Sequence, residues 1–119
     1  MIAVTAQTRI WVARAPVDFR CGIDGLAQVC RKVLQSDPFS GALFVFRNRR
    51  SKSIKILSYN GRGFWLCQNR LSKGRFRWWP EGSQASLTLE AHQLQLLLAG
   101  GDPAAAKGVA IWRPVQEKS

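Results

Sequence analysis

The sequence ALFVFRNRRSKSIKILSYNG occupies positions 42–61, and this stretch decides the fold. Residues 42–47 are rich in aromatic and branched side chains and predict a strand, and residues 53–59, which alternate in part, predict its hairpin partner. The polar, basic residues 48–51 form the predicted turn between them. Asn60-Gly61 signals a second hairpin turn, because both residues tolerate a positive φ. The centre of the chain therefore predicts an antiparallel sheet.

On the amino-terminal side, a strand and a helix are predicted before this sheet region. Residues 9–14 are rich in β-formers, and Pro16 ends their pairing. Asp18 is the predicted N-cap of a helix that runs to about Gln35. Its apolar residues recur at spacings of three, four and seven, which is typical of one helical face. Residues 37–41 have the composition of a turn.

On the carboxyl-terminal side, residues 64–71 fit either a strand or a helix, and their place after a hairpin turn favours the strand. Residues 75–79 predict a short strand that Pro80 closes. Thr88 is the predicted cap of a last helix through Ala99, which residues 100–103 terminate. The predicted fold class is α+β, a small and mostly antiparallel sheet with one helix before it and one helix after it.

Length and composition predict one globular domain. The chain has 119 residues, of which 46% are hydrophobic and 21% are charged. We expect residues 1–103 to form the domain and residues 104–119 to be a loosely attached tail. The three cysteines have no C-x-x-C spacing and so indicate neither a disulfide framework nor a zinc site. The first residues lack the features of a secretory signal, no apolar run is long enough to span a membrane, and a cytoplasmic location is expected.

Charge is concentrated in the middle third of the chain. Lys and Arg number 18 and Asp and Glu number 7, so the net charge is +11. No acidic residue falls between Asp37 and Glu81, whereas ten basic residues lie between positions 47 and 77. A basic stretch of this kind can neutralise phosphates and release counterions.

Aromatic residues are interleaved with these bases, and exposed aromatics can stack on unpaired nucleotide bases. Aromatic side chains in short strands are more often core residues, but the adjacent Trp78 and Trp79 would point to opposite faces of a strand, so both cannot enter one core face. The predicted nucleic-acid-binding residues are Arg47, Arg49, Arg50, Lys52, Lys55, Arg62, Arg70, Lys73, Arg75, Arg77, Trp78 and Trp79.

Signals for catalysis, cofactors and metals are missing from the sequence. His92 is the single histidine, and no second group marks a Ser/His/Asp or Cys/His site. The seven acids do not cluster as metal-dependent phosphoryl chemistry requires. Neither a P-loop nor a dinucleotide-binding motif occurs. We therefore expect a protein that is not an enzyme and that has no cofactor and no bound metal.

Several short motifs, taken in order, resemble one family. The sequence is similar to the accessory protein, often called TnpB, of the sixty-six family of bacterial insertion sequences, and the likeness covers about residues 9–100. The motifs that carry it are PVDFR at 16–20, GIDGL at 22–26, DPFSG at 37–41, LFVFR at 43–47, IKIL at 54–57, NG at 60–61, RLSKGRF at 70–76 and WP at 79–80.

The resemblance implies a non-enzymatic accessory protein of transposition that assists a separate DDE transposase. Together with the basic stretch, it predicts DNA as a partner, with the ends of the element as candidate sites, beside the transposase and the element's other accessory protein. Two alternatives stay open. One is a protein-interaction module that docks on the transposase complex through its basic face, and the other is a general RNA-binding protein. The oligomeric state is left undetermined by the sequence.

Overall fold

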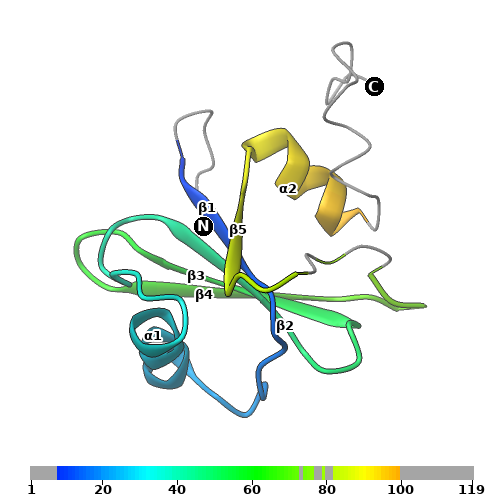
Figure 1. Ribbon diagram of the computed structural model, residues 1–119, viewed down its shortest axis with the longest axis horizontal. Coiled ribbons are helices and arrows are strands. Elements are labelled where there is room, and N and C mark those ends of the chain that lie inside the picture. Colours follow the sequence, from blue (N-terminus) through cyan, green and yellow to red (C-terminus); the bar gives the residue numbers. More distant parts are fainter. Residues whose placement is uncertain (1–7, 73, 77–78, 80–81, 100–119) are drawn as a thin grey trace.

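The computed structural model describes residues 8–72, 74–76, 79 and 82–99. Five strands and two helices follow one another in these residues (Figure 1). In chain order they are β1 (Ile10–Ala13), α1 (Ile23–Lys32), β2 (Leu43–Arg47), β3 (Ser53–Tyr59), β4 (Phe64–Arg70), β5 (Ser86–Leu89) and α2 (Ala91–Leu98).

The strands form one sheet in the order β4-β3-β2-β1-β5. The β1–β2 pair is parallel, since α1 carries the chain back between the two strands, and the other three pairs are antiparallel. One helix precedes and one follows the run from β2 to β5. The predicted α+β class, with a mostly antiparallel sheet and a helix on either side of it in sequence, is confirmed.

The two helices cover opposite faces of the sheet, as Figure 1 shows. Successive strand residues point to opposite faces, so each strand contributes to two cores. Leu94 and Leu97 of α2 pack on one face, and Leu26 and Cys30 of α1 on the other. The core on the α2 face includes Ile10, Val12, Leu43, Val45 and Ile54 from the strands. The core on the α1 face includes Ala13, Phe44, Phe46 and Leu57.

Sequence periodicity located the strands well. The strands predicted at 9–14, 42–47 and 53–59 are found as β1, β2 and β3, and the stretch at 64–71 is a strand, as favoured. The second hairpin differs in detail from the prediction. Its loop has Asn60 N donating to Gly63 O at 3.1 Å, and of its two expected residues only Gly61 has a positive φ, at 95°.

Both helices are shorter than predicted, because the capping residues were wrongly assigned. The first helix begins at Ile23 after Gly22, since the Asp18 carboxylate accepts hydrogen bonds from Arg20 instead of capping a helix. Thr88 lies in β5, and α2 begins at Ala91 after Glu90. The described part of the strand predicted at 75–79 is not in a strand. The predicted tail at 104–119 lies outside the described residues.

Candidate nucleic-acid interface

One end of the sheet brings together three segments that are far apart in sequence. The segment after β1, the turn between β2 and β3, and the segment after β4 all meet there, because β1, β2 and β4 finish at this end. Backbone hydrogen bonds join the segments. Val17 N donates to Arg47 O at 3.0 Å, Leu71 N donates to Lys52 O at 2.9 Å, and Phe76 N donates to Ser51 O at 2.7 Å.

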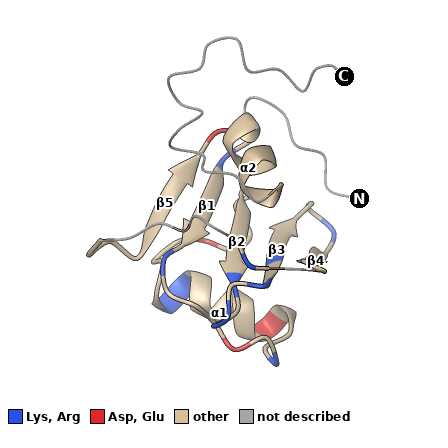
Figure 2. Cartoon of the chain, turned by 90° about the vertical axis from the view of Figure 1, so that its right-hand side faces the viewer, with Lys and Arg blue, Asp and Glu red and all other residues tan. Residues whose placement is uncertain are grey.

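Five exposed basic side chains extend from this end, and we call them the basic end. Three of them occupy the β2–β3 turn, one is the last residue of β4, and one follows β4. They are Arg49, Arg50, Lys52, Arg70 and Arg75. Figure 2 shows Lys and Arg gathered where β2 finishes and β3 begins. Residues up to 26 positions apart in sequence therefore share one end of the molecule.

The β2–β3 turn has a defined conformation that presents Arg49 and Arg50 at its tip. The side-chain oxygen Oδ1 of Asn48 accepts hydrogen bonds from Lys52 N at 3.0 Å and Ser53 N at 3.2 Å. Ser51 adopts a positive φ of 56° and donates its N–H to Asn48 O at 3.0 Å. Because the turn is closed by its own hydrogen bonds, the two arginines project from a fixed backbone.

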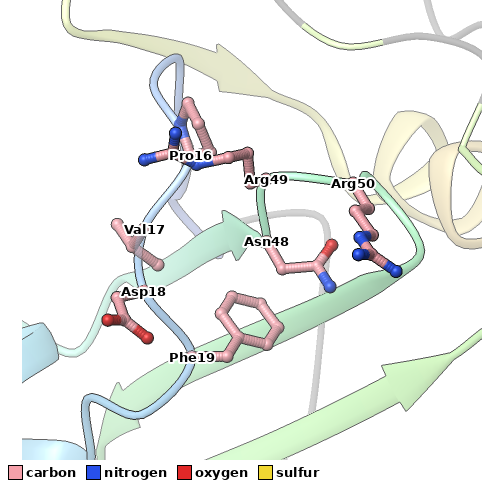
Figure 3. A pocket seen from close by; sticks show the side chains of 7 residues that line it. All are labelled: Pro16, Val17, Asp18, Phe19, Asn48, Arg49 and Arg50. Atoms are coloured by element: carbon pink, nitrogen blue, oxygen red, sulfur yellow. The ribbon is translucent and has the colours of Figure 1, made fainter.

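A cleft of about 360 Å³ opens between this turn and the segment after β1. Its walls combine a basic side with an apolar side. It is lined by Pro16, Val17, Asp18, Phe19, Asn48, Arg49 and Arg50. In Figure 3 the Arg49 and Arg50 side chains extend to opposite sides of Asn48, and the Phe19 ring lies beneath. The cleft thus offers guanidinium donors beside an aromatic ring, groups that suit phosphate and base contacts respectively.

Asp18 is the one carboxylate among the residues that line the cleft, and it is paired. Its oxygens accept hydrogen bonds from Arg20 N at 2.9 Å, Arg20 Nε at 3.0 Å and Arg20 Nη2 at 2.7 Å. The side-chain hydrogen bond from Arg20 is the main cause that lowers the pKa of Asp18 to about 2, and the charge of Arg49 adds to it. The carboxylate is therefore paired with Arg20, and among the described residues no ion pair to the Arg49 guanidinium occurs.

Two of the predicted binding residues have structural partners inside the protein. Lys55 is only 7% exposed, and its Nζ donates to Phe19 O at 2.9 Å and to Cys21 O at 3.2 Å. Arg47 donates to Ser51 Oγ at 3.0 Å and to the carbonyl of Arg14 at 3.2 Å, and burial lowers its pKa. Neither charge faces solvent as the basic end does, so we leave both residues out of the interface.

Trp79 also has a structural partner. Its Nε1–H donates to Ala13 O at 2.7 Å, and its ring packs against the core on the α2 face and under the guanidinium of Arg47. Arg62 is exposed, but it lies in the β3–β4 turn, at the opposite end of two seven-residue strands, roughly 20 Å away. Lys73, Arg77 and Trp78 lie outside the described residues.

Within the described residues, no carboxylate makes an ion pair with any member of the basic end. The same part of the chain holds no group of three His, Cys, Asp or Glu side chains that could bind a metal. None of its helices has the length and apolar character needed to cross a membrane. Among the described residues, the arrangement offers a cluster of cations without ion-pair partners beside a cleft.

Sequence reasoning missed the contribution of Asn48 and of the 16–19 segment to this site. The signal for Asn48 was present, because asparagine side chains often bond backbone N–H groups further along a turn. The approach of Phe19 to the turn had no local signal. It depends on the parallel pairing of β1 with β2, which brings the segment after β1 beside the end of β2.

Comparison with known proteins identifies the family to which this chain is similar. The model of the family described as "IS66 Orf2 like protein" matches residues 8–108. The chain is similar to two proteins of Sinorhizobium fredii (strain NBRC 101917 / NGR234), both described as uncharacterized. It is 35% identical to y4hO, with 98% of this chain and 93% of y4hO covered. It is 34% identical to y4jC, with 98% of each chain covered. No solved structure matches the chain.

Proposed function

The chain belongs to the IS66 Orf2-like family of insertion-sequence accessory proteins, and from that premise we propose that it binds DNA through the basic end and assists a separate DDE transposase. The observation that supports the proposal is the set of five exposed cations on the β2–β3 turn, the end of β4 and the segment after it, with no carboxylate paired to them among the described residues. Cations left unpaired by the protein attract a phosphate polymer.

Such a surface binds DNA mainly through its backbone. Each phosphate that a lysine or arginine neutralises releases condensed counterions, so affinity falls with salt by about 0.9 log units per contact and per log unit of salt. If all five residues of the basic end contact phosphates, the slope of log K against log salt for duplex DNA is about −4.5. Arginine forks and the cleft beside them provide the means for further contacts with base edges or unpaired bases.

A titration of labelled duplex DNA by fluorescence anisotropy, repeated at several salt concentrations, tests the proposal. The variant Arg49→Ala/Arg50→Ala should weaken binding and reduce the steepness of the slope by about 1.8. The control is Arg9→Ala, which removes an exposed arginine at the other end of the sheet, away from the β4 edge, and should leave the slope unchanged. A wild-type slope near zero, or equal effects of the two variants, would refute the basic end as the DNA site.

The same titration separates DNA from the alternative partners. Competition with single strands, structured RNA and duplexes carrying the element ends ranks the nucleic acids, and an excess preference for RNA would favour a general RNA-binding protein. Association with the transposase is measured by co-purification after nuclease treatment. Complexes that survive the nuclease support direct docking between acidic and basic protein surfaces, and complexes that are lost indicate a DNA bridge.

In this proposal the bond-breaking chemistry belongs to the transposase, and the accessory protein acts in the bacterial cytoplasm where the element's DNA lies. The role of the accessory protein is to add a phosphate-binding surface to the complex of transposase and DNA. Purified protein should therefore not nick DNA in the presence of Mg²⁺. Nicking that Asp18→Asn or Asp24→Asn abolished would contradict this division of labour.

A further inference from the structure

The strand β4 (Phe64–Arg70) is an edge strand with an unused row of backbone groups. The hydrogen bonds that flank the β3–β4 ladder, Leu71 N to Lys52 O and Asn60 N to Gly63 O, fix which residues face β3. By the alternation of an antiparallel ladder, the odd-numbered residues of β4 bond to β3. The N–H and C=O groups of the even-numbered residues point away from the sheet, and no partner for them occurs among the described residues.

We propose that this edge pairs with the same edge of a second copy of the chain, antiparallel and centred on Cys67. Cys67 is the middle residue of the seven in β4, so a two-fold axis there aligns the whole strand with its copy. Leu66 then bonds Gln68 of the second copy, and Phe64 bonds Arg70. All four residues are even-numbered, so this register uses every outward-facing backbone group and joins the two five-stranded sheets into one.

The side chains of β4 suit this pairing. Arg70 is the one charged residue in the strand, and the register places it opposite Phe64 of the second copy, with the two arginines at opposite ends. Like charges therefore do not meet across the axis, and each guanidinium lies beside an aromatic ring. Exposed aromatics flank the edge on both faces. Trp65 is 42% exposed, and Phe39, whose ring centroid is 5.1 Å from that of Phe64, is 48% exposed.

Protection against such pairing is weak at this edge. Native edge strands are commonly blunted by proline, by an inward-pointing charge, by a bulge or by short length. The β4 strand pairs with β3 over seven consecutive residues without a bulge and contains no proline. The other edge, β5, has only four residues and pairs over all four with β1. The longer edge with exposed aromatics is therefore the one suited to a second copy.

Cross-linking tests the register directly. In the proposed dimer the two Cys67 residues form a non-hydrogen-bonded pair, with Cα atoms about 4.5 Å apart, within the range that a disulfide bridges. Cys67 is a free, partly exposed thiol. Copper phenanthroline should remove two electrons and two protons from the thiol pair and give a covalent dimer of about twice 13.3 kDa. Cys21→Ser should cross-link as the wild type does, and Cys67→Ser should lose the cross-link.

A second test removes the edge donor without touching the ladder to β3. The N–H of Gln68 points outward, so proline there deletes a dimer hydrogen bond and blocks close approach while β3–β4 pairing is kept. Sedimentation velocity over a range of concentrations, in salt high enough to strip nucleic acid, should show a monomer–dimer equilibrium for the wild type and for the matched control Gln68→Ala. Gln68→Pro should raise the dissociation constant at least tenfold, with the circular dichroism spectrum unchanged.

Three results would overturn the proposal. They are a wild-type protein that stays monomeric at every concentration, a covalent dimer formed through Cys21 and not through Cys67, and a dimer whose dissociation constant Gln68→Pro leaves unchanged. If Gln68→Pro fails to fold, the cysteine experiment decides alone, because it uses the wild-type strand. DNA binding is measured separately, so failure of the dimer leaves the basic end as proposed.

Discussion

Replacing Lys55 by methionine should destabilise the protein without altering a phosphate-binding surface. The Lys55 side chain crosses from β3 to the segment before α1, where its Nζ donates to the carbonyls of Phe19 and Cys21 at 2.9 and 3.2 Å. The ammonium also lies 4.9 Å from the centroid of the Phe19 ring. Methionine keeps most of the apolar stem but has neither the charge nor the donors, so the variant isolates these three contacts.

The magnitude follows from the contacts. A hydrogen bond to a charged group contributes about 1.5–3 kcal/mol, and a cation–π contact up to about 1 kcal/mol more. Phe19 and Cys21 are only half-buried, so water replaces part of what their carbonyls lose. The expected decrease in the free energy of unfolding is about 2–3 kcal/mol. At roughly 4 °C per kcal/mol for a domain of this size, Tm should fall by about 10 °C.

Urea denaturation followed by tryptophan fluorescence measures the effect. The matched control is Lys52→Met, three positions earlier, where the same residue type is exposed in the turn and the change should stay within about 0.5 kcal/mol. In DNA titrations Lys55→Met should leave the salt slope unchanged, whereas Lys52→Met should reduce its steepness by about 0.9. Equal stabilities of the two variants would refute the structural role given to Lys55.

Three further predictions concern the elements around the site. Trp79→Phe, which removes a 2.7 Å hydrogen bond to a β1 carbonyl, should lower the free energy of unfolding by about 1–2 kcal/mol in urea titrations. Gly61→Ala, at φ 95°, should cost about 1–2 kcal/mol in the same assay, whereas Gly63→Ala should be nearly neutral. Arg20→Ala should return the pKa of Asp18 from about 2 toward 3.8 in a carboxyl NMR titration. In the wild type the folded-state pKa of Asp18 is depressed, so the stabilisation that its carboxylate provides is present above pH 4 and is lost as pH falls toward 2.

The strands could be predicted from the sequence because the residues that favour a strand lie within the strand itself and in the turns beside it. Runs of branched and aromatic residues between turn residues placed β1, β2 and β3 at nearly their observed bounds. Both helix starts were wrong, for different reasons. The first helix begins after Gly22 without a side-chain cap, so no capping residue marks its start. Thr88 is the commoner cap by type, but Glu90 and Gln93 form the reciprocal capping box, so the helix begins after Glu90. A search for that two-residue box would have found the start.

The candidate site was predicted less completely than the fold, because charge along a sequence says nothing about direction in space. Of the ten bases between positions 47 and 77, the structure brings five together at the basic end and turns Arg47 and Lys55 inward. Arg62 lies in the β3–β4 turn, at the end of the sheet opposite the basic end. The direction of each side chain depends on the alternation of a strand between its two faces. The Lys55 side chain lies on the α1 face of β3, where its Nζ reaches the backbone carbonyls of Phe19 and Cys21.

The contacts of Arg47 and Lys55 explain how a long segment without acidic residues can fold while its exposed cations stay available to bind phosphate. A buried cation needs a partner, and from position 38 to position 80 the chain supplies no carboxylate. Backbone carbonyls and aromatic rings take that role: the carbonyl of Arg14 and the Trp79 ring for Arg47, and two loop carbonyls and the Phe19 ring for Lys55. The compensation is incomplete at Arg47, whose buried Nε has no hydrogen-bond partner among the residues that the structure describes.

Neutral partners stabilise the inward charges without adding negative charge to the surface. Had carboxylates been used instead, their field would extend to the nearby turn and weaken the attraction of the basic end for phosphate. The one carboxylate that does line the cleft is held by Arg20 through several hydrogen bonds. Introducing an acid in the turn, as in Ser51→Asp, should therefore reduce DNA affinity more than removing Arg62 does. An anisotropy titration of the two variants at one salt concentration distinguishes a collective field from separate contacts.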